Sequence, residues 1–155
     1  MNLFGLMEAS GSAMQAERMR AEVVAANMAN AETTRTESGG PYKRQHVVFA
    51  ANQADEGFLH SLSNASQPAL QSTENTEPAG GVHISQVIED SAPPLKRYDP
   101  GHPDAGPDGY VAYPDINPLT EMVDLMGATR AYGLNSSAVQ AEKGMITSAL
   151  DIARS

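Results

Sequence analysis

The clearest hydrophobic pattern covers the end of the chain, from Asn117 to Ser155. Steps of three and four residues connect ten positions, seven of them apolar: Met122, Leu125, Thr129, Tyr132, Ser136, Val139, Lys143, Ile146, Leu150 and Ala153. A period of about 3.5 is typical of a helix that keeps one seam against a partner helix. Asn117 is a favourable N-cap and Pro118 suits the first helical position. The pattern predicts a long helix over 117–155 that needs a partner, because such a helix alone is marginally stable in water.

A second helical pattern covers residues 3–30, which contain no proline. It has two adjoining stripes, which read Leu3, Met7, Ser10, Met14, Glu17, Ala21, Val24 and Met28, and Leu6, Ala9, Ala13, Ala16, Arg20, Val23 and Asn27. Their small side chains each bury little area, so we expect this helix to need neighbours on several sides. The β-branched residues at 33–36 predict that it ends near Asn30.

Residues 34–116 have a different character and predict a small β-rich, loop-rich insertion. Strands are expected over 42–50, 82–89, 95–98 and 110–113. In the second strand, one face is predicted to carry Val82, Ile84 and Ile88, and the other His83, Ser85 and Val87. The turn signal Ser38-Gly39-Gly40-Pro41 precedes the first strand. The polar stretch 52–81 is predicted to be a mobile loop.

The predicted fold is mainly α, with the two terminal helices forming an antiparallel coiled coil around which the insertion is built. Residues 1–33 and 117–155 would form one discontinuous inner domain, because each apolar stripe lacks a partner within its own segment. Residues 34–116 would form the insertion, which lets the chain turn back.

The formal net charge of −9 is concentrated in the middle of the chain. Residues 31–116 hold five basic and twelve acidic residues, whereas each end is nearly neutral. This balance argues against nucleic acid or an anionic membrane surface as the main partner. No apolar run is long enough to cross a membrane, and the first residues lack the pattern of a cleaved secretory signal. The absence of cysteine excludes disulfides and thiolate chemistry.

No convincing catalytic constellation is present in the sequence, and we predict neither an enzyme nor a cofactor. The most suggestive cluster is Asp99, His102, Asp104 and Asp108, in a stretch rich in glycine and proline. The spacing of an EF-hand loop fails there, and aspartates among glycines and prolines favour turn hydrogen bonds. A weak divalent-cation site and a metal-dependent hydrolase remain alternative interpretations of this cluster.

Several motifs resemble the bacterial flagellar rod and hook protein family. Residues 26–33, Ala-Asn-Met-Ala-Asn-Ala-Glu-Thr, resemble the signature that closes the N-terminal helix of that family. Residues 117–135, with Glu-Met-Val and Arg-Ala-Tyr, resemble its C-terminal helix signature. In the insertion, residues 39–45 and 98–114 resemble one branch of the family, the proximal rod proteins. The segment 115–118 departs from the family's usual proline-free helix start.

The resemblance implies a structural subunit that assembles helically into the proximal rod, the drive shaft that crosses the periplasm and surrounds the export channel. It implies contacts with copies of itself, other rod proteins, the rod-to-membrane-ring junction protein and the flagellar type III export machinery, with no cleaved signal peptide. The alternative is a soluble helical adaptor that binds a single partner helix.

Two groups of residues are predicted to matter. The predicted assembly residues are Leu6, Ala13, Val24, Asn27, Asn30, Thr33, Met122, Leu125, Arg130, Tyr132, Val139, Ile146 and Leu150. The insertion motif comprises Tyr98, Asp99, Gly101, His102, Asp104, Gly109 and Tyr110. Among the first group, Asn27, Asn30 and Thr33 are expected to cap the last turn of the N-terminal helix.

Overall fold

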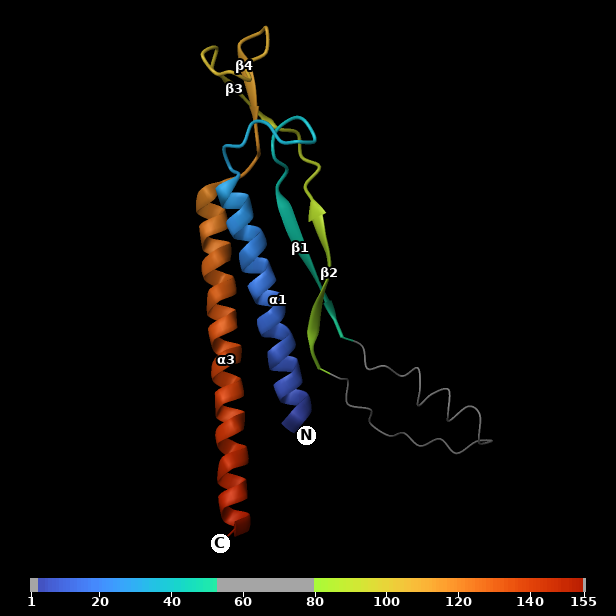
Figure 1. Cartoon of the computed structure of the whole chain (residues 1–155), viewed down its shortest axis with the longest axis vertical. Helices are drawn as coiled ribbons and strands as arrows, with labels where there is room; N and C mark the ends of the chain where they lie inside the picture. Colours follow the sequence, from blue (N-terminus) through green and yellow to red (C-terminus); the bar gives the residue numbers. More distant parts are fainter. Residues whose placement is uncertain (1–2, 53–79, 155) are drawn as a thin grey trace, which may run out of the picture.

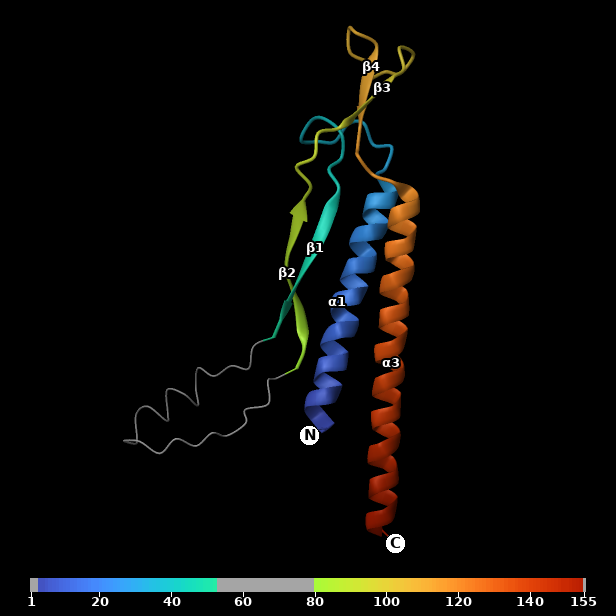
Figure 2. The ribbon, with the colours of Figure 1, turned by 180° about the vertical axis from the view of Figure 1, so that it is seen from behind.

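Two long antiparallel helices dominate the computed structural model, which describes residues 3–52 and 80–154. Helix α1 spans Leu3–Ala29 and helix α3 spans Pro118–Arg154. They lie side by side in both views, and the last turns of α3 extend beyond the N-terminal end of α1 (Figures 1 and 2). The predicted fold class, a helical pair with a small strand insertion, is confirmed.

Helix α3 begins at the residue that the sequence predicts. The backbone N–H of Leu119 donates to the Asn117 side-chain Oδ1 at 3.0 Å, and the Glu121 N–H donates to the Asn117 carbonyl at 3.1 Å. Pro118 is the first helical residue, where its missing N–H leaves no hydrogen bond unmade. Asn117 therefore acts as the predicted N-cap.

The face of α3 that packs on α1 differs from the predicted stripe. Its most buried residues are Glu121, Ala128 and Glu142, spaced by multiples of seven. Of the predicted stripe, three members are exposed by 49, 44 and 58%: Met122, Tyr132 and Leu150. Three others are half-buried: Leu125, Val139 and Ile146. The predicted stripe is therefore buried only in part, because the positions that face α1 keep the heptad spacing but lie one residue before Met122, Thr129 and Lys143.

Strands β1 (Gln45–Ala51) and β2 (Val82–Glu89) form an antiparallel ribbon beside α1, on the side away from α3 (Figure 1). Ser12 of α1 holds the end of the ribbon where Ala51 pairs with Val82, because the N–H of Val82 donates to the Ser12 hydroxyl at 3.1 Å. Gly81, the residue before Val82, has φ +147°. A Cβ added to Gly81 would lie 2.9 Å from the side-chain amide nitrogen of Asn52. The ribbon and α1 are thus in close contact where the strand begins. The predicted mobile loop 52–81 lies mostly outside the described residues.

A bulge in this ribbon changes which side chains share a face. The pairing shifts in the middle of the ribbon, where Ser85 has no direct partner. Beyond it, Val87 pairs with Val47, which lines the cleft against α1. Opposed residues share a face, so Val87 lies with Val82 and Ile88 lies opposite. The prediction that placed Ile88 on the face of Val82 is wrong, because simple alternation does not allow for the extra residue.

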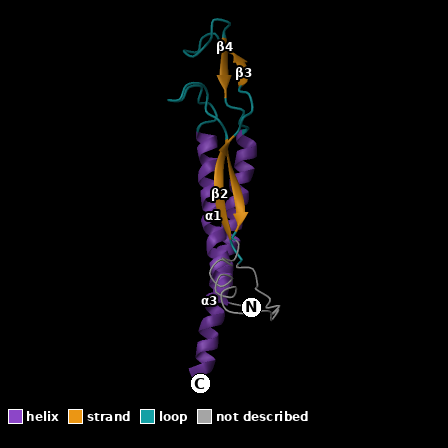
Figure 3. Cartoon of the chain, turned by 90° about the vertical axis from the view of Figure 1, so that its right-hand side faces the viewer, coloured by secondary structure: helices purple, strands orange, loops and turns teal. Residues whose placement is uncertain are grey.

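Strands β3 (Leu95–Tyr98) and β4 (Tyr110–Tyr113) form a second hairpin beyond the junction of the two helices (Figure 3). All residues of β3 are exposed, whereas Val111 and Tyr113 of β4 are buried. Ile116, in the segment between the hairpin and α3, is buried as well, and these three residues are called the apolar cluster below. Isolated two-stranded hairpins are marginally stable, so this cluster matters for the position of the hairpin.

Candidate assembly interface

A buried asparagine closes the junction where α1 ends and α3 begins. Asn27 is 1% exposed. Its Nδ2 donates to the Gln45 carbonyl at 2.9 Å and to Glu121 Oε2 at 3.1 Å. Its Oδ1 accepts from the Gln45 N–H at 2.9 Å and from the Tyr42 hydroxyl at 3.2 Å. All four hydrogen-bonding positions of the amide are used, so one side chain joins both helices and β1.

Charged groups surround this amide. Arg44 forms an ion pair with Glu121, which is itself 1% exposed. Asp124 lies 3.9 Å from Arg44 and 3.6 Å from Arg20, and Arg20 also lies 3.7 Å from Glu17. Because a buried carboxylate is stable only when paired, Arg44 makes the burial of Glu121 tolerable. The group formed by Asn27, Tyr42, Arg44 and Glu121 is called the polar junction below.

The pKa of Tyr42, a member of the polar junction, is displaced from its ordinary value. Burial of the hydroxyl raises the pKa of Tyr42 above its ordinary value of 10.0, and the negative charges of Glu89 and Glu121 raise it further. The phenol therefore stays protonated as a donor to Asn27 over the ordinary pH range.

The residues predicted to cap α1 divide into two kinds. Asn30 Nδ2 donates back to the Ala26 carbonyl at 2.9 Å, and the Thr33 hydroxyl donates to Asn30 Oδ1 at 3.1 Å. The Tyr42 N–H then bonds to the Thr33 carbonyl at 3.0 Å. Asn27 does not cap the helix end as predicted, because its side chain bonds to β1 and α3 instead.

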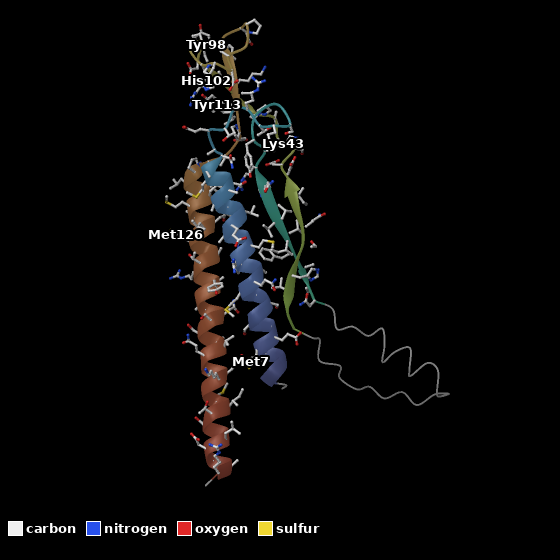
Figure 4. All side chains as sticks on the ribbon, in the orientation of Figure 1. Met7, Lys43, Tyr98, His102, Tyr113 and Met126 are labelled. Carbon is white, nitrogen blue, oxygen red and sulfur yellow. The ribbon has the colours of Figure 1, made fainter. Side chains whose placement is uncertain are left out.

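The insertion motif forms the tip of the β3–β4 hairpin. Tyr98 and Tyr110 stack edge to face with ring centroids 5.4 Å apart. Gly109 has φ +75°, and an added Cβ there would lie 2.8 Å from the Tyr98 ring. Gly101 is exposed, and the N–H of His102 donates to the Asp99 carbonyl at 3.2 Å within a turn. Figure 4 shows the labelled Tyr98, His102 and Tyr113 together in this hairpin.

Asp104 links this tip to the segment that follows α1. The Thr34 hydroxyl donates to Asp104 Oδ2 at 2.8 Å, and Arg35 lies 3.7 Å from Oδ1. In the described residues, no group of three or more His, Cys, Asp or Glu side chains could hold a metal ion. The turn hydrogen bonds and the tie to Thr34 therefore account for the positions of these aspartates.

The structure distributes the remaining predicted assembly residues over both helices. On α1, Val24 is buried beside the cleft that Asn27 and Glu121 also line, Ala13 is half-buried and Leu6 is 46% exposed. On α3, Arg130 is exposed, like Met122, Tyr132 and Leu150. The structure therefore brings together Val24, Asn27 and the α3 residues that face them, and leaves the others at the surface.

Sequence reasoning missed an apolar stripe on α3, called the outer stripe below. It contains large apolar side chains that are 61–69% exposed: Leu119, Val123, Met126 and Leu134. Arg130 falls between Met126 and Leu134 in the same three-and-four spacing, so these residues share one side of the helix. Figure 4 shows the labelled Met126 on the side of α3 away from α1. The same three-and-four spacing is visible in the sequence, but the stripe that begins at Met122 contains more residues and was therefore selected.

No helix in the described part of the chain is both long enough and apolar enough to span a membrane. The exposed apolar side chains of α3 lie on a helix that also carries Asp, Glu, Lys and Arg along its length. This combination is typical of an interaction surface between proteins.

Comparison with known proteins gives the class of the chain. Residues 7–35 match the family described as flagella basal body rod protein, and residues 108–152 match the C-terminal family of flagellar basal body rod FlgEFG proteins. Each matched region includes most of a long helix, with Asn27 of the polar junction in the first and Glu121 in the second. The chain belongs to the flagellar basal-body rod protein family.

Curated relatives identify the branch of that family. The flagellar basal-body rod protein FlgC of Bacillus subtilis is 37% identical over 99% of this chain and 100% of its own length. The FlgC proteins of Borreliella burgdorferi and Salmonella typhimurium are 34% and 32% identical, each over 98% of both chains. The resemblance drawn from the sequence motifs is thereby confirmed, and the chain has a structural role in the flagellar basal-body rod.

Proposed function

We propose that this chain is a subunit of the proximal rod, where it assembles helically with copies of itself and with related rod proteins. The observation that carries the proposal is the outer stripe, in which Leu119, Val123, Met126 and Leu134 are mostly exposed. A second apolar surface faces another direction and includes Met122, Tyr132 and Leu150. Neighbouring subunits on several sides would cover both surfaces.

The finer expectations follow from the family relationship. The discontinuous unit 1–33 and 117–155 would form the inner, channel-lining layer, and the insertion 34–116 would lie outside it. The rod-to-membrane-ring junction protein would be a neighbour, and the chain would be exported uncleaved by the flagellar type III apparatus into the periplasm. A weakly packed helical pair supports this route, because a chain that opens readily is easier to pass through a narrow channel.

The alternative is a soluble adaptor that binds one partner helix. It would require one continuous apolar groove, whereas the exposed apolar residues of α3 are spread around more than one side of the helix. Electron microscopy of the purified chain mixed with other rod proteins distinguishes the two: filaments or rods support the proposal, and a discrete complex of fixed size supports the adaptor.

A substitution in the outer stripe tests the proposal in cells. Met126→Glu should leave the isolated chain as helical as the wild type, because the side chain is 65% exposed, but should abolish swimming. Met126→Leu, which keeps the site apolar, is the matched control and should swim normally. Normal swimming with Met126→Glu would show that the outer stripe is not an assembly surface.

Arg130→Ala provides an independent check at the polar member of the stripe. The side chain is exposed, so the variant should accumulate to wild-type levels, yet it should not support motility. Swimming at wild-type speed with this variant would count against an assembly role for the residue.

A further inference from the structure

Glu142 is a buried carboxylate without a partner. It is 2% exposed, and neither of its two carboxylate oxygens has a hydrogen-bond partner. It lies on the α1-facing side of α3, a multiple of seven residues after Glu121. Burying a carboxylate without compensation is unfavourable by several kcal/mol, so buried charges in proteins are normally paired. No described residue of the isolated subunit supplies the donor that this position needs.

Both oxygens of Glu142 are covered in the isolated chain, so an outside donor reaches them only if the neighbouring end of α1 moves aside on assembly. The position of Glu142 along the helix pair shows which end of α1 that is. Glu142 is 21 residues after Glu121, and Leu6 is 21 residues before Asn27. Because Asn27 contacts Glu121 and the helices are antiparallel, Glu142 lies at about the level of Leu6, near the N-terminal end of α1. Beyond this level α3 continues without α1 beside it (Figure 1).

The supply of basic side chains narrows the choice of donor. All ten lysines and arginines lie in the described part of the chain. Five are in ion pairs with other acidic groups: Arg18, Arg20, Arg35, Lys43 and Arg44. Arg97 stacks on Tyr113 and donates to its hydroxyl. The basic residues without such a contact to another described residue are Lys96, Arg130, Lys143 and Arg154.

Among these four residues, Arg130 has the most suitable chemistry and position. Its guanidinium can donate two parallel hydrogen bonds to a carboxylate with two free oxygens, which an ammonium cannot do. Arg154 also has a guanidinium, but it lies in the last turn of α3, where it interacts favourably with the helix carbonyls. Arg130 is instead in the outer stripe, between exposed apolar residues that a neighbour would cover.

We infer that Glu142 receives Arg130 of a second copy of this chain, forming an ion pair between subunits that exists only in the assembled state. This inference rests on the proposed function, because it needs neighbouring copies. The apolar flanks of the two residues match: Arg130 lies between Met126 and Leu134, and Glu142 is followed on its own face by Ile146 and Leu150. The last turns of α3 and the outer stripe of the next copy would then form one continuous contact.

Chemical cross-linking tests the pair directly, because the chain has no cysteine of its own. Glu142→Cys and Arg130→Cys chains are co-expressed with an excess of wild-type chain, so that rods assemble mainly from wild-type subunits. Basal bodies are then isolated and treated with a short bifunctional maleimide. A cross-linked dimer of the two variants is expected, and each variant expressed alone should give none.

Two control pairs of cysteine variants test whether the cross-link is specific to residues 142 and 130. Glu142→Cys combined with Lys143→Cys or Arg154→Cys should give no dimer. Rods that assemble normally but give no 142–130 dimer, or that give a dimer with a control residue instead, overturn the inference and leave the proposed function intact. Failure of the wild-type chain itself to build rods would overturn both.

The stability of the isolated chain provides a second readout. Glu142→Gln should raise the midpoint of thermal unfolding by several degrees, because it removes an unpaired buried charge. Glu8→Gln, at an exposed position of α1, is the matched control and should leave the midpoint unchanged. A lower midpoint for Glu142→Gln would show that the isolated subunit already satisfies the carboxylate, which contradicts the inference.

Swimming speed completes the test as a double-mutant cycle. Glu142→Gln and Arg130→Gln should each reduce swimming, and the double variant should be no slower than the slower single variant. Reductions that multiply in the double variant would show that the two residues act independently.

Discussion

The two ends of the helical pair contain buried glutamates in very different states. At the end where α1 leaves the pair, Glu121 accepts from Asn27 and is paired with Arg44. At the opposite end, Glu142 is almost equally buried and makes neither a hydrogen bond nor an ion pair with the described residues. The buried carboxylate of the first end is therefore paired within one subunit, whereas we infer that the second is paired only in the assembly. The comparison separates interactions that fold the chain from interactions that assemble it.

The largest loss of stability is expected from a substitution in the polar junction, at the end where α1 leaves the helical pair. Asn27→Ala would remove four hydrogen bonds and leave one oxygen of Glu121, the Tyr42 hydroxyl and the backbone N–H and C=O of Gln45 without a hydrogen-bond partner. Unsatisfied buried groups cost about 1–3 kcal/mol each, so the variant should be less stable by about 4 kcal/mol. Chemical denaturation followed by circular dichroism measures this loss.

Asn135→Ala is the matched control for Asn27. The Asn135 side chain donates only to the Ala131 carbonyl of its own helix, so its loss should change the stability by less than about 1 kcal/mol. Equal losses for the two asparagines would contradict the special role of the polar junction.

Arg44→Met should have the next largest effect. It leaves the carboxylate of Glu121 buried and uncompensated, which costs about 2–3 kcal/mol for a pair whose arginine is partly exposed. Lys43→Met is the control, because Lys43 and Glu89 form a pair that is well exposed on both sides. Thermal unfolding of the two variants compares them, and similar midpoints would show that the junction needs no cation.

Gly81→Ala should have a smaller and more local effect. The positive φ and the close contacts to Asn52 and Ser12 leave no room for a Cβ, so the start of β2 must move away from α1, at a cost of about 1–3 kcal/mol. Gly80→Ala is the control, since its added Cβ would make only an ordinary contact with Ala9 at 3.5 Å. Faster amide exchange in β2 of the Gly81 variant alone is the expected result; unchanged exchange would contradict it.

The smallest effect concerns pH. The pKa of Tyr42 is raised in the folded chain, so the folded state holds its proton more tightly than the unfolded state does. The resulting stability is fully present below about pH 10, the ordinary tyrosine pKa, and is lost as the pH rises through the higher folded value. The stability difference between the wild type and Tyr42→Phe should therefore shrink above about pH 10. A stability difference that grows with pH would show that folding does not raise the pKa of Tyr42.

Much of the fold could be predicted from local signals in the sequence. The start of α3 follows from Asn117 and Pro118, whose effects act within one helical turn. The β3–β4 hairpin follows from the dense run of glycine, proline and aspartate between its strands. These elements depend on neighbours in the sequence, and so their residue types are sufficient to define them.

The candidate site depended on contacts between distant residues and was predicted only in part. Asn27 was selected from a motif, but its bonds to Gln45 and Glu121 join segments 18 and 94 residues apart. Arg44, Glu142 and Ser12 carry no local signal for their roles. The buried face of α3 was misplaced because its central positions are glutamate, alanine and asparagine, and a search for apolar residues excludes them.

Hydrogen exchange of backbone amides in the isolated chain tests the central claim most directly. The account predicts slow exchange near the polar junction, at the end of α1 and the start of α3, because those turns open only when the buried network breaks. It predicts much faster exchange in the first turns of α1 and in α3 beyond Glu142, and slow exchange at both ends in assembled rods. Uniformly slow exchange along both helices of the isolated chain would show that the subunit is already complete, and would contradict the account.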